Sequence, residues 1–223
     1  MKRLMTIAAL ALGQAACVAN QGDAPFRFLD ARALTFEEGV GCVPSDELVL
    51  GSGSLDLSGS GNYLMAMSVE TNNSTQPITI NQEQFSGPGL NDITVSEFVY
   101  SYQFQPITAG VTVALPADEE DRVALYRVLR PGTNADQSYV FMNAFGPKMV
   151  EVLRSFPVGS VGTVFATIKA RGRLSGGQTV ESNKFTFPIT VSASGASSCP
   201  PGQIPAGACQ ILGQDGSGCV DPT

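Results

Sequence analysis

The chain has 223 residues, with 13 Lys and Arg against 20 Asp and Glu, a formal net charge of -7 and a pI near 4.5. This charge argues against nucleic acid as a partner, because phosphate binding requires a basic face. The lack of histidine excludes Ser-His-Asp and Cys-His triads and every His-ligated metal site. An apolar fraction of 43% is too high for intrinsic disorder, and the length suits one domain with flanking segments.

Residues 1–16 have the pattern of a secretory signal peptide. Two basic residues precede nine apolar residues at 4–12, which match a signal h-region and are too short to span a bilayer. Small residues then lead to Cys17, an arrangement that resembles a bacterial lipobox although Gln14 stands where leucine is usual. We expect cleavage before Cys17 and lipidation of its side chain. Plain secretion after ordinary cleavage is the alternative.

The cysteine count supports this assignment. The chain has five cysteines, and assigning Cys17 to lipid leaves an even set: Cys42, Cys199, Cys209 and Cys219. In an exported protein we expect these four to form two disulfides, and the sequence leaves all three connectivities open. A metal site is not expected, because no two of the four lie two to four residues apart. A bridge from Cys42 to the tail would join both ends of the domain and add about 4–5 kcal/mol in the chain-entropy model.

Acyl chains on Cys17 would provide the attachment to a membrane. By resemblance to enterobacterial sorting, Val18 in place of aspartate implies passage to the outer membrane. Cleavage would remove two of the 13 basic residues, leaving 11 against 20 acidic residues and a charge of -9. We therefore expect attachment to depend on lipid and not on a basic patch.

From residue 48 onward, apolar and polar residues alternate in several stretches, a pattern typical of antiparallel strands with one buried face. The residues expected on buried faces are Tyr63, Met65, Met67 and Val69; Phe98, Tyr100, Tyr102 and Phe104; Val164, Ala166, Ile168 and Ala170; and Phe185, Phe187, Ile189 and Val191. The stretches 163–173 and 178–192, joined by a Gly-Gly turn, form the clearest predicted hairpin. Pro188 within the second stretch indicates an edge position or a bulge.

Three further segments have a predicted conformation. Residues 111–115 are a short strand candidate. Residues 118–130 suit a helix or a strand, and the surrounding strands favour the strand. Pro147 suits the first position of a short helix, whose apolar stripe would be Met149, Val152, Leu153 and Phe156.

Together these elements predict an all-β fold, an antiparallel β-sandwich of Ig-like or fibronectin-like topology with one short helix. The expected organisation is a signal peptide at 1–16, a lipidated tether at 17–42, the sandwich at 43–193, and a Gly/Pro/Cys-rich tail at 194–223 that contains disulfides.

This layout is similar to uncharacterised lipoproteins of myxobacteria and related bacteria, whose β-sandwich domains end in a short Cys-rich segment. The residues that carry the resemblance are Cys17, Cys42, Gly53-Ser54-Leu55-Asp56-Leu57-Ser58, Tyr63, Val69-Glu70-Thr71-Asn72, Phe185-Thr186-Phe187-Pro188-Ile189 and the cysteine-bearing tail. The resemblance covers most of the mature chain. It implies a surface or periplasmic location and brings no catalytic residues to this sequence.

Acidic residues are the remaining candidates for chemistry. The cluster Asp118–Asp121 is expected to be a solvated loop and not a calcium site, because consecutive acids point in diverging directions. Glu70, Asp92 and Glu97 are candidates for a pair of hydrolytic carboxylates, although nothing in the sequence brings two of them together. Residues 214–218 suit only a turn.

The aromatic row Phe98, Tyr100, Tyr102 and Phe104 is expected to pack in the core, with a sugar- or peptide-stacking platform as the alternative. We therefore expect a non-enzymatic, lipid-anchored envelope protein without cofactor or metal, which acts as a structural or binding module toward another envelope protein or a polysaccharide. The alternatives are a histidine-free hydrolase that uses carboxylates and an accessory subunit of an envelope complex.

Overall fold

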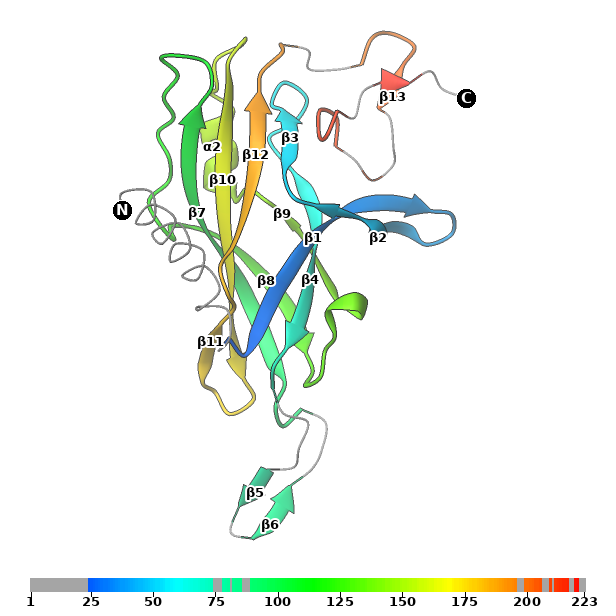
Figure 1. The fold of residues 1–223 in the computed structure, drawn as a ribbon, viewed down its shortest axis with the longest axis vertical. Coiled ribbons are helices and arrows are strands. Elements are labelled where there is room, and N and C mark those ends of the chain that lie inside the picture. The colour runs from blue at the N-terminus through cyan, green and yellow to red at the C-terminus, as the bar shows by residue number, and fades with distance from the viewer. Residues whose placement is uncertain are drawn as a thin grey trace, which may run out of the picture.

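The computed structural model describes residues 24–73, 78–80, 82–85, 89–195, 199–205, 209, 211–216 and 219–220. Two β-sheets pack face to face around the core (Figure 1). The first sheet has the order β2 (Gly41–Leu50), β1 (Phe26–Glu37), β4 (Leu64–Thr71) and β9 (Tyr139–Asn143). The second has the order β3 (Gly53–Asp56), β12 (Phe185–Ser192), β10 (Val161–Leu174), β7 (Ile93–Pro106) and β8 (Asp121–Leu129), with β11 (Thr179–Glu181) paired to β10.

The strand order is that of an Ig-like sandwich. Strands β1, β4 and β9 occupy the A, B and E positions of one sheet, and β7, β8, β10 and β12 occupy C, C′, F and G of the other. The short strand β3 pairs with β12 in parallel, while the other pairs within the two sheets are antiparallel. The predicted all-β sandwich with one short helix is therefore confirmed.

The smaller elements lie around the two sheets. The helix α2 (Pro147–Leu153) is the one predicted from its proline start, and η1 (Ala135–Gln137) is a single 3-10 turn. The pair β5 (Ile78–Ile80) and β6 (Glu83–Phe85) forms a hairpin beyond one end of the sandwich (Figure 1). The pair β13 (Ile204–Pro205) and β14 (Cys219–Val220) lies in the C-terminal segment.

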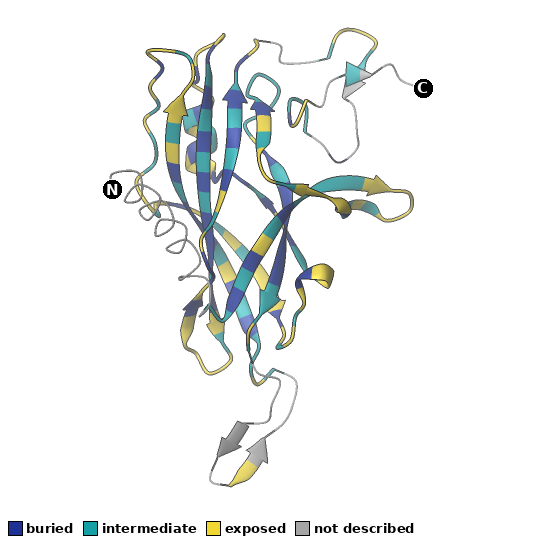
Figure 2. Cartoon of the chain, in the orientation of Figure 1, coloured by how far each residue is buried: buried dark blue, intermediate teal, exposed yellow. Residues whose placement is uncertain are grey.

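The alternating stretches bury the faces that the sequence predicts (Figure 2). Side chains at every second position of β4 and β10 are fully buried, among them Met65, Met67, Ile168 and Ala170. The residues Phe98, Tyr100 and Tyr102 of the aromatic row are buried as well, and Phe104 packs against the core from its rim. The prediction that this row packs in the core is confirmed.

The tether predicted for 17–42 is wrong from Phe26 onward, because residues 26–37 form the central strand β1. Phe26 and Phe28 are buried in the core. The register of β1 against β4 then shifts between Phe28 and Ala31, and this irregularity moves the next buried side chain from position 30 to position 31. Because the alternation breaks after Phe28, a search for alternating apolar residues does not detect this strand. The sandwich therefore begins at Phe26 and not at residue 43.

Two other local predictions have mixed outcomes. Residues 121–129 form β8, as the surrounding strands suggested. Residues 111–115, predicted as a strand, lie outside both sheets. Pro188 lies where β12 is locally an edge, because β3 pairs only with residues 189–192; its missing N–H therefore costs no pairing there.

The C-terminal segment is fastened to the sandwich and is not a free tail. Disulfides join Cys42 to Cys209 and Cys199 to Cys219, a pairing that the cysteine count left open. The Gln214 side chain accepts a hydrogen bond from the Leu64 amide at 2.9 Å and donates to the Leu64 carbonyl at 2.7 Å. A single side chain thus takes the place of a neighbouring strand at the end of β4.

Asp215 extends this contact to the opposite sheet. Its carboxylate accepts hydrogen bonds from the Tyr63 hydroxyl at 2.7 Å and from the Ser54 amide at 2.8 Å. Burial, with the hydrogen bond to Asp215, raises the pKa of Tyr63 well above its ordinary value, so this hydroxyl stays protonated as a donor. Residues 214–218, predicted only as a turn, therefore include two anchoring side chains.

Candidate functional site

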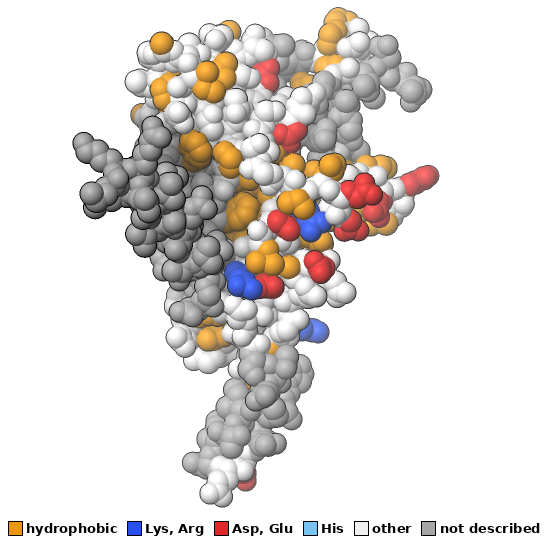
Figure 3. All heavy atoms as spheres, in the orientation of Figure 1, with side chains coloured by type: hydrophobic (Ala, Val, Ile, Leu, Met, Phe, Trp, Pro, Cys, Tyr) orange, Lys and Arg blue, Asp and Glu red, His pale blue; other side chains and the backbone are white. Residues whose placement is uncertain are grey.

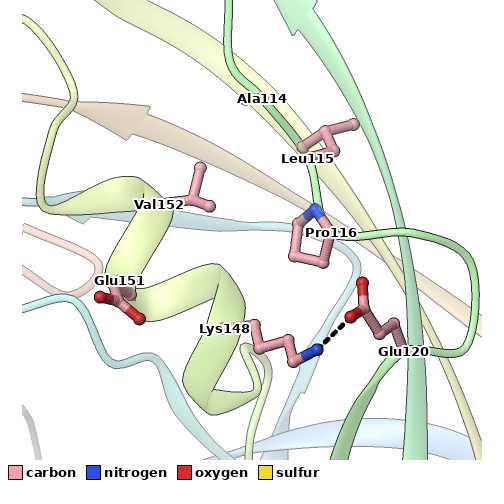
Figure 4. A pocket seen from close by; sticks show the side chains of 7 residues that line it. All are labelled: Ala114, Leu115, Pro116, Glu120, Lys148, Glu151 and Val152. Atoms are coloured by element: carbon pink, nitrogen blue, oxygen red, sulfur yellow. Dashed lines mark hydrogen bonds and ion pairs between the residues drawn. The ribbon is translucent and has the colours of Figure 1, made fainter.

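A groove lies between helix α2 and the segment at 111–117 that connects β7 to β8 (Figure 4). One part has a volume of about 370 Å³ and an adjoining part about 140 Å³; Ala114 and Val152 line both. The lining residues are Thr112, Val113, Ala114, Leu115, Pro116 and Glu120 on one side, and Lys148, Glu151, Val152, Ser155, Phe156 and Pro157 on the other. Apolar walls with a few charged groups are typical of a ligand site.

The helical wall is held by its own apolar face. Met149 and Leu153 of α2 are buried in the core. Beyond the helix, the Phe156 ring packs edge-on against Phe104 of β7, with 6.0 Å between centroids. The buried stripe leaves Lys148, Glu151 and Val152 to line the groove.

The buried carboxylate of Asp121, the first residue of β8, fixes the start of this helix. It accepts hydrogen bonds from the amides of Lys148 at 3.1 Å and Met149 at 3.0 Å, and from the Tyr102 hydroxyl at 3.0 Å. The Tyr102 hydroxyl in turn accepts from the Gly146 amide at 2.8 Å. These bonds satisfy donors at the helix N-terminus that have no partner within the helix.

Two neighbours of Asp121 are adapted to it. A Cβ atom on Gly146 would lie 2.5 Å from the Asp121 carboxyl carbon, so only glycine fits there. Burial raises the pKa of Tyr102 far above its ordinary value, with a further increase from the nearby Asp121 charge. Tyr102 therefore remains a neutral donor.

The opposite wall resembles a strand without a partner. Val111 is buried, and Val113 and Leu115 pack against the core, while Thr112 and Ala114 are exposed. Within the described residues, no hydrogen bond joins the backbone of 112–115 to another group. This wall therefore combines strand-like side-chain alternation with free backbone donors and acceptors.

The groove has a small excess of negative charge. Lys148 forms an ion pair with Glu120, drawn as a dashed line in Figure 4, and this bond lowers the pKa of Glu120. Glu151 is exposed on the next turn of α2 and has no ion pair among the described residues. Since Lys148 and Glu120 neutralise one another, Glu151 sets the net charge of the lining.

A second cluster of charges lies on the second sheet, outside the groove. Glu119 bonds to Lys169 and Arg171, both at 2.6 Å, and Glu181 bonds to the same two bases at 3.0 Å and 2.6 Å. The hydrogen bond from Arg171 is the main cause that lowers the pKa of Glu181. This network of opposite charges neutralises itself and leaves no open ligand position in the described contacts.

The acidic cluster Asp118–Asp121 is thus divided among separate roles. Glu119 and Glu120 form ion pairs, and Asp118 is exposed. The solvated-loop prediction is wrong for Asp121, whose side chain is buried because it completes the start of α2. Among the residues that the structure describes, no group of acids and cysteines is arranged to hold a metal ion.

The three candidate hydrolytic carboxylates do not meet. Glu70 of β4 forms an ion pair with Arg27 on the first sheet. Glu97 of β7 is near Arg122 at 3.9 Å and Arg171 at 3.6 Å on the second sheet. Asp92 contributes its backbone carbonyl to the turn after β10. Glu70 and Glu97 thus lie in different sheets, each beside a base.

A further surface is the projecting hairpin of β1 and β2. It exposes Phe36, Val40, Leu48 and Val49. Figure 3 shows acidic side chains gathered over it. Cys42 of this hairpin is joined to the C-terminal segment by its disulfide with Cys209.

Cys17, predicted to be lipidated, lies outside the described residues, together with the predicted signal peptide at 1–16. In the part of the chain that is described, no helix is long and apolar enough to cross a membrane. The two disulfides indicate an oxidising environment, as found by exported proteins. No protein-family model matches the chain, and neither a curated protein nor a solved structure is significantly similar to it.

Apart from Glu120, a member of the acidic cluster, the groove residues were not among the candidates that the sequence suggested. Leu115, Pro116 and Val152 lack any chemical motif, and Glu151 is an ordinary surface acid on a helix. A usable signal was present nonetheless. A short strand pattern at 111–115 that ends at Pro116 has no obvious partner in the chain, and a helix start follows β9.

Proposed function

We propose that the protein is a non-catalytic binding module of the bacterial cell envelope, anchored in the outer membrane by acyl chains on Cys17. The two disulfides, Cys42–Cys209 and Cys199–Cys219, are the observation that carries this proposal. They use four of the five cysteines and leave only Cys17 for another role. The lipobox-like sequence before Cys17 and the preceding apolar stretch support lipid as that role.

The groove supports a binding role. Its walls are mostly apolar, and one of its two carboxylates, that of Glu120, is already held in an ion pair by Lys148, which leaves Glu151 as the one carboxylate of the lining without an ion pair in the described contacts. Hydrolysis of a glycoside requires two carboxylates that face one bond from both sides. Recognition requires only shape, apolar contact and a few oriented polar groups, all of which the groove offers.

The similarity to myxobacterial lipoproteins, proposed from sequence features, fits the same role. An Ig-like sandwich is a rigid scaffold on which binding surfaces are placed, and it carries no chemistry of its own. The partner would be another component of the envelope.

The anchor is tested by mass spectrometry of the intact protein from bacterial membranes. We expect a mature chain that begins at Cys17 and carries the added mass of three acyl chains, with no free thiol before reduction. The variant Cys17→Ser should lose both the lipid mass and the membrane fraction. The variant Cys199→Ser/Cys219→Ser is the matched control and should keep both.

Two results would reject the anchor. An unacylated mature N-terminus would indicate plain secretion, and a membrane-bound Cys17→Ser protein would indicate attachment by another part of the chain. Free thiols before reduction would contradict the oxidised, exported state.

A further inference from the structure

The backbone groups of 112–115, in the wall of the groove, form no hydrogen bond with any other described residue. Buried or half-buried backbone donors and acceptors are normally paired, and a β-like segment finds its partners in a neighbouring strand. Here the side chains of Val111, Val113 and Leu115 already pack on the core. The side chains of the segment are therefore arranged as in a strand, but its backbone forms no hydrogen bonds with a neighbouring strand among the described residues.

The C-terminal part of the adjacent strand β7 also has no described strand on one of its sides. Strand β8 pairs with β7 only as far as Tyr100, which is opposite Asp121. From Ser101 to Gln105, β7 has β10 on one side, and the described strands place none on the other. Among the described residues, both the connecting segment and this part of β7 thus lack a strand neighbour on one side.

We propose that the groove binds an extended polypeptide segment of a partner protein, which adds a β-strand to residues 112–115 and directs alternate apolar side chains at Ala114 and Val152. This rests on the proposed function as a binding module and names the class of its partner. In strand addition, main-chain hydrogen bonds supply affinity, and pockets for alternate side chains supply specificity. The open, largely apolar groove beside the segment offers places for those side chains.

Charge selects between partner segments. Glu151 lies on α2 at the edge of the groove and has no basic neighbour among the described ion pairs, whereas Lys148 is already bound to Glu120. A lysine or arginine in the bound strand would form an ion pair with the Glu151 carboxylate. A second copy of this chain is disfavoured as occupant, because each copy carries a net charge of -7 and would bring its own Glu151 to the same edge.

Hydrogen–deuterium exchange on the full chain tests the proposal with a defined probe. The probe is a short capped peptide of alternating valine and threonine with one central lysine. Without peptide, we expect the amides of 112–115 to exchange rapidly. Added peptide should slow their exchange in a saturable manner, while the buried strand β10 stays unchanged.

A chemically matched peptide separates backbone pairing from side-chain docking. N-methylation of alternate amides removes donors and keeps every side chain, so it should abolish the protection. Equal protection by the methylated peptide would overturn strand addition. Because the change is made in the peptide, the folding of the protein is not affected.

Charge selectivity has its own control. The peptide with lysine should bind about 2- to 5-fold more tightly than one with glutamate, as expected for an exposed charge pair. The variant Glu151→Gln should remove this preference. The variant Glu37→Gln, at the far end of β1, should retain it. A preference unchanged in Glu151→Gln would contradict the assigned charge contact.

The outcomes also separate this inference from the broader function. Protection confined to another segment, such as β2, would overturn the site while leaving a binding module in place. Protection of 112–115 that increases with protein concentration alone would identify a second copy as the occupant and overturn the proposed partner. Failure of the lipid anchor would appear only in the membrane fractionation.

Discussion

The carboxylate of Asp121 lies 3.0 Å from the amide nitrogen of Met149 and ties the first residue of β8 to the first turn of α2. These residues are separated by 28 positions in the chain, and α2 has no side-chain cap of its own, since Gly146 precedes it. The position of the helix on the sandwich, and with it the width of the groove, therefore depends on the residue that follows Glu120 of the opposite wall.

Replacement of Asp121 tests this dependence. Asp121→Ala leaves the amides of Lys148 and Met149 and the Tyr102 hydroxyl without their acceptor, so we expect a loss of about 2–4 kcal/mol in the free energy of unfolding. Urea unfolding measures the loss, and exchange at the α2 amides should rise. Asp118→Ala, at an exposed site three residues earlier, should change stability by less than about 0.5 kcal/mol. Similar losses for the two variants would contradict the role of Asp121.

The two disulfides should differ in their contribution to stability. Cys42–Cys209 joins residues 167 positions apart, whereas Cys199–Cys219 joins residues 20 apart. In the chain-entropy model these loops correspond to about 5 and about 3 kcal/mol. Thermal unfolding of the double variants Cys42→Ser/Cys209→Ser and Cys199→Ser/Cys219→Ser should show the larger loss for the first. The reverse order would mean that the long bridge fastens a segment that adds nothing to the folded sandwich.

The charge network on the second sheet predicts a dependence on pH. Arg171 lowers the pKa of Glu181 below its ordinary value of 4.5, so the stabilisation is complete above that value and is lost as the pH falls through the folded-state pKa. For Lys169, burial acts to lower the pKa, but the bonds to Glu119 and Glu181 outweigh it and raise the pKa above 10.5. Its contribution is present below 10.5 and is lost as the pH rises further.

Glu181→Gln should therefore cost about 0.5–1 kcal/mol at neutral pH and become neutral in acid or in high salt. Urea unfolding at several pH values measures both effects. Glu37→Gln, an exposed acid without an ion pair in the described contacts, is the control. A cost that persists unchanged in acid would show that Glu181 acts through packing and not through its charge.

The contact of Gln214 with Leu64 predicts how the C-terminal segment opens. Gln214→Leu keeps the bulk of the side chain but leaves the Leu64 amide and carbonyl unpaired, at a cost of about 1–3 kcal/mol. We expect faster hydrogen exchange at Leu64 and at the Asp56 amide, which donates to Gly213. Gln178→Leu, at an exposed turn, should leave both rates unchanged. Unaltered exchange in Gln214→Leu would mean that the disulfides and the contacts of Asp215 hold the segment without Gln214.

The strands were predictable from the sequence where apolar and polar residues alternate along their whole length. In β4 and β10 every residue of the predicted apolar face is buried, and a few residues of the other face, such as Ser68 and Lys169, are buried as well. Both strands run through the centre of a sheet. In β1 the irregularity after Phe28 changes which face is buried, and the pattern fails although Phe26 and Phe28 are core residues. Strand register depends on neighbours that a local pattern does not contain.

The groove was not predictable for a related reason. The alternation at 111–115 correctly marks which side chains face the core, but pairing depends on whether another strand is present at that edge. Asp121 looked like the last member of a solvated acidic run, and its role depends on a helix that starts 26 residues later. Both features arise from contacts between distant segments.

The start of β1 at Phe26 sets how far the protein can work from a membrane. If Cys17 carries lipid, as proposed, only nine residue steps separate the bilayer surface from the first strand, at most about 30 Å when fully extended. A tether of this length keeps the sandwich close to the bilayer surface. A partner would have to approach the membrane to be bound, so the protein would act on neighbours in the same envelope layer and not as a long arm across the periplasm.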